Sequence, residues 1–396
     1  MRGVLSGALL DPEGEACSAM KQLYGWMGKI LRVDLSTRRV STVDTEDYAA
    51  KYIGGLGIAH RIAWEEIPPG TGTFDPGNKL LLMTGPLTGT PALASGRAEL
   101  GFIAAQGVPE QYIHSGIGGW FPSQIKHAGF DGIIVEGAAS APCYLWIHDG
   151  EAEIRDAGTL WGLGTYDTQQ ELRRIHGDSV QSLCIGPAGE NRSRIAVMLT
   201  DTENAFGQGG SGGVAGAKRL KAICVGGTKR VWVARPQELL KARAELADPR
   251  IHGSLAVEKN PAIEGRFPAG LSAWEVRCGR WHRKACSQAC AKMCFWELEG
   301  VPRVTRPGFH GGQIGCVGGN FAAWEGDMPF SENAPYWPLW SQGFEAGFEM
   351  CELANQYGLN EWEIIAGMVP WLVMGNRMGV ISERLFGGPI NPSSPE

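Results

Sequence analysis

The stretch GKILRVDLSTRRVSTVD, residues 28–44, alternates apolar and polar side chains on both sides of a turn-like centre. Alternation with a period of two is typical of half-buried strands, so the stretch predicts a β-hairpin. Short apolar runs bounded by glycine follow in KLLLMTG (79–85) and DGIIVEG (131–137), as expected of buried strands. A second hairpin is predicted in residues 142–157, with an Asp-Gly turn. The first part of the chain is therefore predicted to be rich in strands.

Helices are predicted where the apolar period lengthens to that of an α-helix. Residues 48–67 predict a helix broken at Gly54 and Gly55, and residues 167–177 predict a short amphipathic helix that stops at a glycine. Further along, helices are predicted in residues 237–247, in residues 341–358 before the capping Gly358, and in residues 361–381 with a kink at Pro370.

These patterns predict an α+β protein with a boundary near residue 228. A strand-rich domain is expected over residues 23–227, and an incomplete α-helical domain over residues 228–396. Residues 1–22 are expected to form an N-terminal extension, because they lack the apolar region and cleavage site of a signal peptide.

The composition is that of an ordinary soluble globular protein. The 396 residues are 43% hydrophobic and 20% charged, and no apolar run reaches the ~18 residues that a membrane span needs. A net charge of -6 disfavours nucleic acid and anionic membranes as partners. Ten cysteines without a signal peptide indicate a reducing compartment, and we expect a cytoplasmic protein.

Three of the cysteines recur at every fourth position in CSQACAKMC, namely Cys286, Cys290 and Cys294. On a straight helix the outer two would lie ~12 Å apart, so one metal group can bind all three only if the segment is bent or non-helical. An iron–sulfur cluster, a zinc site with His282 as fourth ligand, and no metal at all remain three interpretations. Cys278 and Cys316 are possible fourth ligands.

The remaining cysteines occur singly in strand or helix patterns. They are predicted to be buried small hydrophobic residues rather than ligands. They are Cys17, Cys143, Cys184, Cys224 and Cys351.

Fifty-seven glycines are about twice the usual share, and many of them form loops next to predicted strands. Such loops expose backbone N–H and C=O groups, as loops that hold large phosphate-bearing cofactors do. No nucleotide-binding GxGxxG or Walker A pattern occurs in its proper setting. The loops are GPLTGT (85–90), SGR (95–97), GIGGWF (116–121), GPAGEN (186–191) and GQGGSGG (207–213).

Over about two hundred residues, these motifs resemble the N-terminal domain of the aldehyde ferredoxin oxidoreductase family, the tungsten bis-pyranopterin enzymes. The resemblance includes YGWMGKILRVDLST (24–37), HAGFDGIIVEG (127–137) and GGSGGVAGAKRLKAI (209–223), together with GPLTGT, SGR, GGWF and GPAGEN, in the family's order and spacing. The cysteine stretch falls where the family begins its [4Fe–4S] ligands.

The resemblance implies a tungsten (or molybdenum) bis-pyranopterin, a [4Fe–4S] cluster, and Mg²⁺ bridging the pterin phosphates. It places Arg97 between pterin and cluster, and Cys286, Cys290 and Cys294 on the cluster. It implies no catalytic residue that we can identify in this chain. The residues that it implies for pterin contact are Gly118, Gly119, Ala205 and Gly209 in the first domain, and Asn355, Gly358, Leu359 and Asn360 in the NQYGLN motif of the second.

The chain departs from the family's pattern in four places, one of which is that Asn204 and Gln208 stand where aldehyde oxidoreductases carry a basic residue before the glycine loop. Its cysteines follow C-x3-C-x3-C instead of C-x2-C-x3-C, its helical motif has asparagine in place of the aspartates of D-x-x-G-L-D, and the acidic motif of the aldehyde-oxidising members has no match. The tungsten subunit of class II benzoyl-coenzyme A reductase is a divergent relative with similar departures. The departures bear on the substrate more than on the cofactor.

The resemblance implies two-electron interconversion of an aldehyde and a carboxylic acid, or of an acyl derivative, with electrons leaving through the cluster to ferredoxin or an iron–sulfur partner subunit. Family members take their fourth cluster cysteine from a third domain, so this chain is expected to be an N-terminal portion. It could form a homodimer or be complemented by a C-terminal fragment. The alternatives are a non-catalytic scaffold or electron-transfer subunit, and a zinc-stabilised structural domain.

Overall fold

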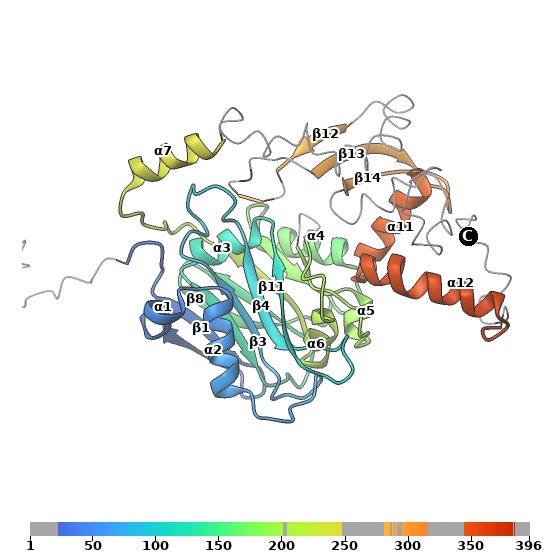
Figure 1. The fold of residues 1–396 in the computed structure, drawn as a ribbon, viewed down its shortest axis with the longest axis horizontal. Coiled ribbons are helices and arrows are strands. Elements are labelled where there is room, and N and C mark those ends of the chain that lie inside the picture. Colours follow the sequence, from blue (N-terminus) through green and yellow to red (C-terminus); the bar gives the residue numbers. More distant parts are fainter. Residues whose placement is uncertain are drawn as a thin grey trace, which may run out of the picture.

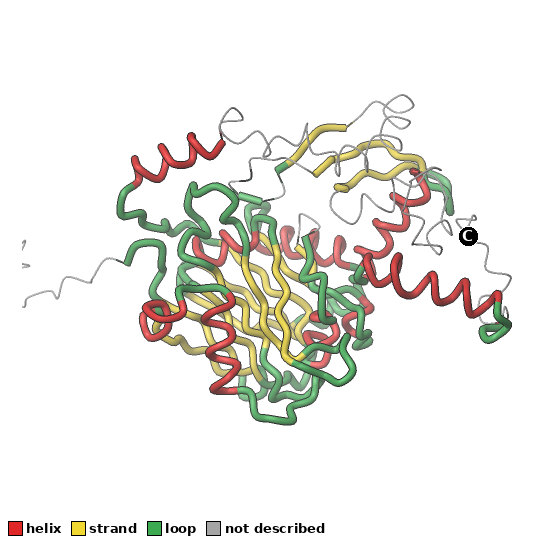
Figure 2. Tube along the Cα trace, in the orientation of Figure 1, coloured by secondary structure: helices red, strands yellow, loops and turns green. Residues whose placement is uncertain are grey.

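The computed structural model describes residues 23–200 and 204–247, residues 281–314 except 286, 289 and 291–294, and residues 344–384 except 383. The expected extension over residues 1–22 lies outside the described residues. The described part is an α+β fold, as predicted, in which two sheets form the centre and pack against each other (Figures 1 and 2).

The first sheet has six strands and contains the predicted N-terminal hairpin. Every neighbouring pair is antiparallel except β1 and β6, which run parallel. Its strands in spatial order are β2 (Arg39–Asp44), β1 (Lys29–Asp34), β6 (Gly132–Glu136), β3 (Leu80–Thr84), β4 (Ala98–Ile103) and β5 (Tyr112–Ile117). β5 is therefore an edge strand.

The second sheet has five strands and contains the second predicted hairpin, β7 and β8. The hairpin turns through Asp149 and Gly150, whose φ angles are 39° and 99°. The strands in spatial order are β10 (Leu199–Thr200), β9 (Gln181–Cys184), β11 (Leu220–Gly226), β7 (Cys143–His148) and β8 (Glu151–Asp156).

The two sheets share one apolar core between their inner faces. Leu100 and Phe102 of the first sheet belong to the same cluster as Leu145 and Ile223 of the second. Helix α2 (Leu56–Glu66) covers the outer face of the first sheet, and α4 (Thr165–His176) covers that of the second. The predicted break at Gly54 and Gly55 is confirmed, since α1 (Glu46–Tyr52) ends just before it.

Two buried ion pairs tie short helices to this core. Lys126 of α3 (Phe121–His127) lies 2.5 Å from Asp131, which also accepts hydrogen bonds from the backbone of Met27 and Gly28. Lys221 of β11 lies 2.5 Å from Glu190 at the end of α5 (Pro187–Glu190). Helix α6 (Ser211–Ala217) packs against α5.

After residue 227 the described residues form helices and one small sheet. The helices α7 (Pro236–Ala247) and α11 (Phe344–Tyr357) are confirmed. A π-helix (Glu363–Met368) is followed directly by α12 (Val369–Arg377). Pro370, where a kink was predicted, is the second residue of α12. The sequence did not predict the antiparallel sheet of β12 (Trp281–Lys284), β13 (Phe295–Pro302) and β14 (Phe309–Ile314), whose register shifts within β13.

Cys143, Cys184, Cys224 and Cys351 are buried, as predicted, whereas Cys17 lies outside the described residues. Among the helices that the structure describes, none combines the length and the apolar character that crossing a membrane requires.

Candidate functional site

Three of the predicted pterin-contact residues lie along the edge strand β5. Gly118 and Gly119 directly follow its last residue, Ile117. Gly209 is in close contact with Ile113 near the start of the strand. Between them, the backbone N–H of Gln208 donates to the hydroxyl of Ser115 at 3.2 Å, so the loop that contains Gly209 runs beside β5.

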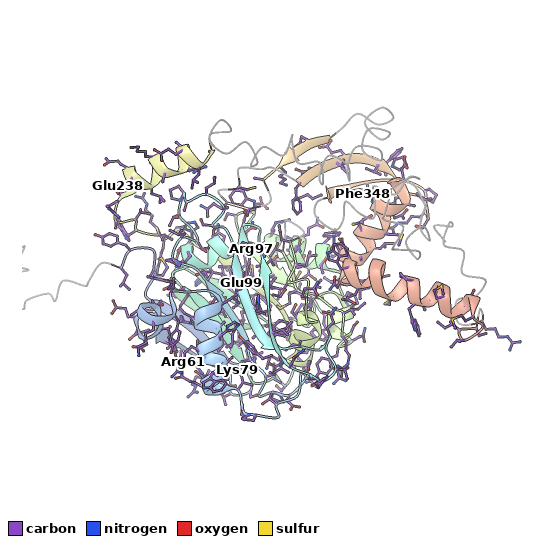
Figure 3. All side chains as sticks on the ribbon, viewed as in Figure 1. Arg61, Lys79, Arg97, Glu99, Glu238 and Phe348 are labelled. Atoms are coloured by element: carbon purple, nitrogen blue, oxygen red, sulfur yellow. The ribbon has the colours of Figure 1, made fainter. Side chains whose placement is uncertain are left out.

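Arg97 immediately precedes β4, the neighbour of β5, and its side chain is exposed. A Cβ on Gly116 would collide with the Arg97 guanidinium and would lie 2.8 Å from an oxygen of Glu99. Because Gly116 has no side chain, there is room beside it for these two charged groups. Figure 3 shows Arg97 and Glu99 towards the end of the sheet that faces β12, opposite the end that carries Lys79.

The described part of the cysteine stretch lies directly on this end of the sheet. Ser287 forms a parallel β-bridge with Gly119. A Cβ on Gly96 would lie 2.7 Å from the carbonyl oxygen of Gln288 and 3.1 Å from the side chain of Ser287. The cysteine stretch therefore contacts both the SGR loop and the GGWF loop.

The described residues of the stretch are not helical, as binding of one metal group by three cysteines would require. Ser287 lies in the bridge and Gln288 in a turn, and the N–H of Cys290 donates to the carbonyl of Ser287 at 3.2 Å. Cys290 is partly buried. Cys286, Cys294, Cys278 and Cys316 lie outside the described residues, so the ligand set stays a prediction.

The NQYGLN motif forms the end of α11 and docks on the first domain. Gly358 has a φ of 73°, which reverses the chain, and its carbonyl accepts from the N–H of Val197 at 2.9 Å. The side-chain amide of Asn360 donates to the carbonyl of Gly207, in the loop that contains Gly209. The motif therefore reaches one of the predicted pterin loops from the opposite side.

Two more of the predicted residues fix the position of this loop and motif. Leu359 forms an antiparallel bridge with Ala196, and Ala205 forms one with Leu199 at the start of β10. The hydroxyl of Thr165 donates to the backbone carbonyl of Asn355 at 2.7 Å. The structure thus brings Leu359 and Asn355 to the interface with the first domain, whereas the bridge of Ala205 lies within that domain.

A charged cluster joins the small sheet to α11. Arg303 binds Glu352 with two hydrogen bonds, of 2.7 and 2.8 Å, and His310 lies 2.5 Å from the same carboxylate. Burial alone would raise the pKa of Glu352, but the hydrogen bonds from His310 and Arg303 outweigh it and lower the pKa to about 2. The sheet that carries the cysteine stretch and the helix that carries NQYGLN are therefore linked.

Buried polar atoms around the site fit a large polar group. Four of them have no hydrogen-bond partner among the described residues, and this is costly unless a further group binds there. Gln106 Nε2 and Gln288 Oε1 lie at the site, and Ser123 Oγ and Gln124 Oε1 lie in α3, the helix that begins in the GGWF loop. Gln106 also accepts from the N–H of Gly209, and Gln288 lies beside Gly96. Together with the exposed Arg97, they supply donors and acceptors suited to a phosphate-bearing heterocycle.

Sequence reasoning did not find Gln106, Gln124 or Gln288, because a single glutamine carries no recognisable pattern. It also did not find Glu361, a buried carboxyl group that directly follows NQYGLN. The GPAGEN loop, expected among the cofactor loops, is in close contact with Tyr357 and Gly358 of the NQYGLN motif through Gly186, and its other end is fixed within the first domain. Its Gly189 packs against the backbone of Gly212, and its Glu190 pairs with Lys221. No group of three His, Cys, Asp or Glu side chains within the described residues could hold a metal ion.

A family model described as "Aldehyde ferredoxin oxidoreductase, N-terminal domain" matches residues 30–227, half of the 396-residue chain. The strand-rich first domain and the motifs that line its edge strand are thus those of a known family. The chain belongs to the aldehyde ferredoxin oxidoreductase family, as the resemblance implied.

Curated relatives agree with this assignment. The chain is 38% identical over 248 residues to the tungsten-containing aldehyde ferredoxin oxidoreductase of Pyrococcus abyssi, covering 62% of this chain and 39% of the relative. It is 35% identical over 228 residues to the WOR-like subunit of aliphatic sulfonate oxidoreductase of Pyrococcus furiosus, covering 52% of this chain and 35% of that subunit. The chain therefore spans well under half the length of these relatives.

Among solved structures, the fold is similar to the active-site complex BamBC of benzoyl coenzyme A reductase, determined with 1,5 dienoyl-CoA. The TM-score is 0.75 at 24% sequence identity, and the match covers 92% of this chain and 58% of that chain. The likeness extends beyond the family's N-terminal domain and supports the arrangement of the small sheet and α11.

Proposed function

We propose that this chain is part of a tungsten-pterin oxidoreductase that interconverts an aldehyde and a carboxylic acid, or an acyl derivative, in a two-electron reaction. The observation that carries the proposal is the contact of Ser287 with Gly119 and Gly96. It brings the cysteine stretch against the two loops that the family resemblance links to the pterin. A cluster held by these cysteines would lie next to the pterin, as electron transfer between them requires.

The chain's own residues would hold the cofactor from two sides. Arg97 offers its exposed guanidinium to a pterin phosphate or to the cluster side of the pterin. Gly118, Gly119 and Gly209 allow close backbone approach, and Asn360 closes the site from α11. The tungsten (or molybdenum) bis-pyranopterin, with Mg²⁺ bridging its phosphates, would supply the two-electron chemistry.

Cys286, Cys290 and Cys294 would bind a [4Fe–4S] cluster that passes electrons one at a time to ferredoxin or to an iron–sulfur partner subunit. The names of two relatives, a WOR-like subunit and BamBC, describe parts of complexes and support a partner subunit. The fourth ligand would come from outside the described residues, from a C-terminal fragment or a second copy of the chain. A cytoplasmic location would suit a chain with ten cysteines, because a reducing compartment keeps thiols available to bind a cluster.

One contact bears on the zinc alternative without deciding against it, because a metal-ligating histidine usually donates its other ring N–H to a carboxylate. His282, the fourth ligand that a zinc site would use, has its Nε2 3.0 Å from a carboxylate oxygen of Glu297, its partner across β12 and β13. That nitrogen is occupied within the small sheet. Of the two nitrogens of the ring, only Nδ1 would remain for a metal.

The test is metal and sulfide analysis of the anaerobically purified full chain, with its visible spectrum. We expect tungsten together with about four iron and four sulfide per chain, and a broad absorption that the cysteines generate. The variant Cys290→Ala should lose iron and colour, whereas Cys143→Ala, a buried cysteine whose pKa burial raises to about 11, should keep both. If the chain contained zinc but neither iron nor tungsten, it would be the zinc-stabilised structural domain. If it contained none of the three metals, it would be the non-catalytic scaffold.

A further inference from the structure

Helix α11 packs against α4 (Figure 1), and a glutamine of its NQYGLN motif binds the first turn of α4. The side-chain Oε1 of Gln356 accepts a hydrogen bond from the backbone N–H of Tyr166 at 2.9 Å. Its Nε2 donates to Oδ2 of Asp167 at 2.7 Å. The first N–H groups of a helix have no partner within the helix. Gln356 therefore caps α4 from a place 190 positions further along the chain.

The residue before α4 leaves room for this amide. Gly164 is at the capping position, where Ser, Thr, Asp or Asn would supply an oxygen from its own side chain. A Cβ on Gly164 would overlap the amide group of Gln356 and would lie 2.6 Å from its Oε1. The backbone of Gly164 is extended, with a φ of -65° and a ψ of 170°, which other residues adopt without strain. The close approach of Gln356, and not the turn, therefore accounts for glycine at this position.

The end of α11 is held to the first domain on both sides of the chain reversal in NQYGLN. Before the reversal, Gln356 binds α4, and the hydroxyl of Thr165 donates to the backbone carbonyl of Asn355 at 2.7 Å. After it, the side-chain amide of Asn360 donates to the carbonyl of Gly207, in the predicted pterin loop. Because only a short turn separates the two sets of contacts, the first set fixes where the second can form.

We propose that Gln356 is a positioning residue of the predicted pterin site, which places Asn360 against the glycine loop by capping α4. The proposal rests on the proposed function. The hydrogen bonds of Gln356 go to α4, so its effect on the cofactor passes through the motif. An amide suits this place, because it accepts from a backbone N–H and donates to a carboxylate at the same time. Its position is an unspecified one in the D-x-x-G-L-D pattern, which therefore assigns it no role.

The contact between Gln356 and Asp167 can be broken and then restored in the opposite sense. The variant Q356E keeps an oxygen that accepts from the N–H of Tyr166, but it cannot donate to Asp167. Two carboxylates then face each other at the start of α4 and repel. Adding D167N restores the hydrogen bond, because the new amide donates to the new carboxylate. A role that depends on this pair predicts such a rescue, whereas a general loss of packing does not.

The experiment uses the full chain, purified anaerobically. Loss of tungsten and pterin during dialysis is followed over time, the pterin by the fluorescence of its oxidised form. Hydrogen exchange of the peptide that contains Tyr166 is measured on the cofactor-free chain, and urea unfolding shows that each variant folds. Gln170, an exposed glutamine of α4, provides the matched control. The variants are Q356A, Q356E, G164A, N360A, Q170A, Q356E/D167N and G164A/Q356A.

We expect Q356A and G164A to lose pterin about tenfold faster than the wild type and Q170A, the scale of two lost hydrogen bonds. G164A/Q356A should lose it no faster than either single variant, because the methyl group and the amide compete for one space. Q356E should behave like Q356A, and Q356E/D167N should recover most of the retention. Exchange at Tyr166 should rise in Q356A and G164A, but not in N360A, which loses pterin at the later contact.

If Q356A and G164A exchange faster at Tyr166 but retain pterin like the wild type, the cap has only a structural role. The inference is then wrong, and the proposed function stands. Pterin loss from Q356E/D167N as fast as from Q356E also contradicts the inference, because the pair is then not the route. If the wild type binds neither pterin nor tungsten under any condition, the proposed function fails and the positioning role fails with it.

Discussion

Two glycine-rich regions of the first domain use glycine for different purposes. At the corner of α5, α6 and β11, glycines allow one backbone to touch another. At the end of β4 and β5 that carries Arg97, Gly116 leaves room for charged side chains, and Gly96 and Gly119 allow the cysteine stretch to approach. The first region builds the scaffold, and the second makes the site.

The contacts at the corner are tight on every side. A Cβ on Gly216 would overlap the carbonyl oxygen of Gly189, and one on Gly212 would lie 2.6 Å from that of Val197. Glu190 accepts from Lys221 at 2.5 Å and from the N–H of Gly162 at 2.9 Å. These atoms belong to packed backbone or to an ion pair whose lysine is fully buried, so they have little room to move aside.

At the site end, Gly116 has softer surroundings than the glycines of the corner. The atoms nearest to Gly116 are the ends of the Arg97 and Glu99 side chains, which can rotate. Glycine in a sequence motif of this family is thus a weak indication of cofactor contact. What surrounds the glycine decides whether its substitution unfolds the protein or disturbs its ligand, and the following variants separate the two cases.

The largest effect is expected from Lys221→Met, which leaves Glu190 buried without its cation. Breaking a buried pair on one side costs about 3–5 kcal/mol of the free energy of unfolding. Urea denaturation of the cofactor-free chain measures it. The double variant Lys221→Met/Glu190→Leu is the control and should recover most of the loss, because both charges are then absent. Equal losses in both variants would mean that packing, not charge, holds the corner.

A smaller loss is expected from Gly216→Ala, because the new methyl group must displace the carbonyl of Gly189. Overpacking of this kind costs about 1–3 kcal/mol. Gly77→Ala is the matched control, since the nearest atom to its Cβ would be 3.8 Å away, in ordinary contact. A Gly216→Ala chain as stable as the control would show that α5 and α6 are not held by backbone contact.

The smallest effect on stability, below about 0.5 kcal/mol, is expected from Gly116→Ala, a partly buried position where only side-chain ends must move. The substitution should instead change how much tungsten and pterin the chain binds. The methyl group pushes the Arg97 guanidinium away, so tungsten and pterin per chain should fall as they do in Arg97→Met. Stability comes from the same urea titration, and metal content from elemental analysis. If Gly116→Ala kept its full tungsten content, the position of Arg97 would not matter for cofactor binding.

Much of the fold could be predicted from residue patterns alone. The hairpins of β1 with β2 and of β7 with β8, the break before α2, and the glycine after α11 follow from alternation and turn residues within short stretches. The small sheet could not, because β13 contains a register shift and β14 contains two glycines, which weaken the alternation. The family could also be recognised, since its motifs are contiguous runs in a fixed order.

The sequence by itself determined the local elements, the family and the residue types available for cofactor and cluster. Periodicity, turn preferences and capping act over a few neighbouring residues, so they can be read along the chain. Only the tertiary structure decided that Ser287 lies on Gly119, that Asn360 reaches Gly207, and that Gln356 caps α4. These contacts join residues more than a hundred positions apart. Packing of the whole chain sets them, and no local pattern records it.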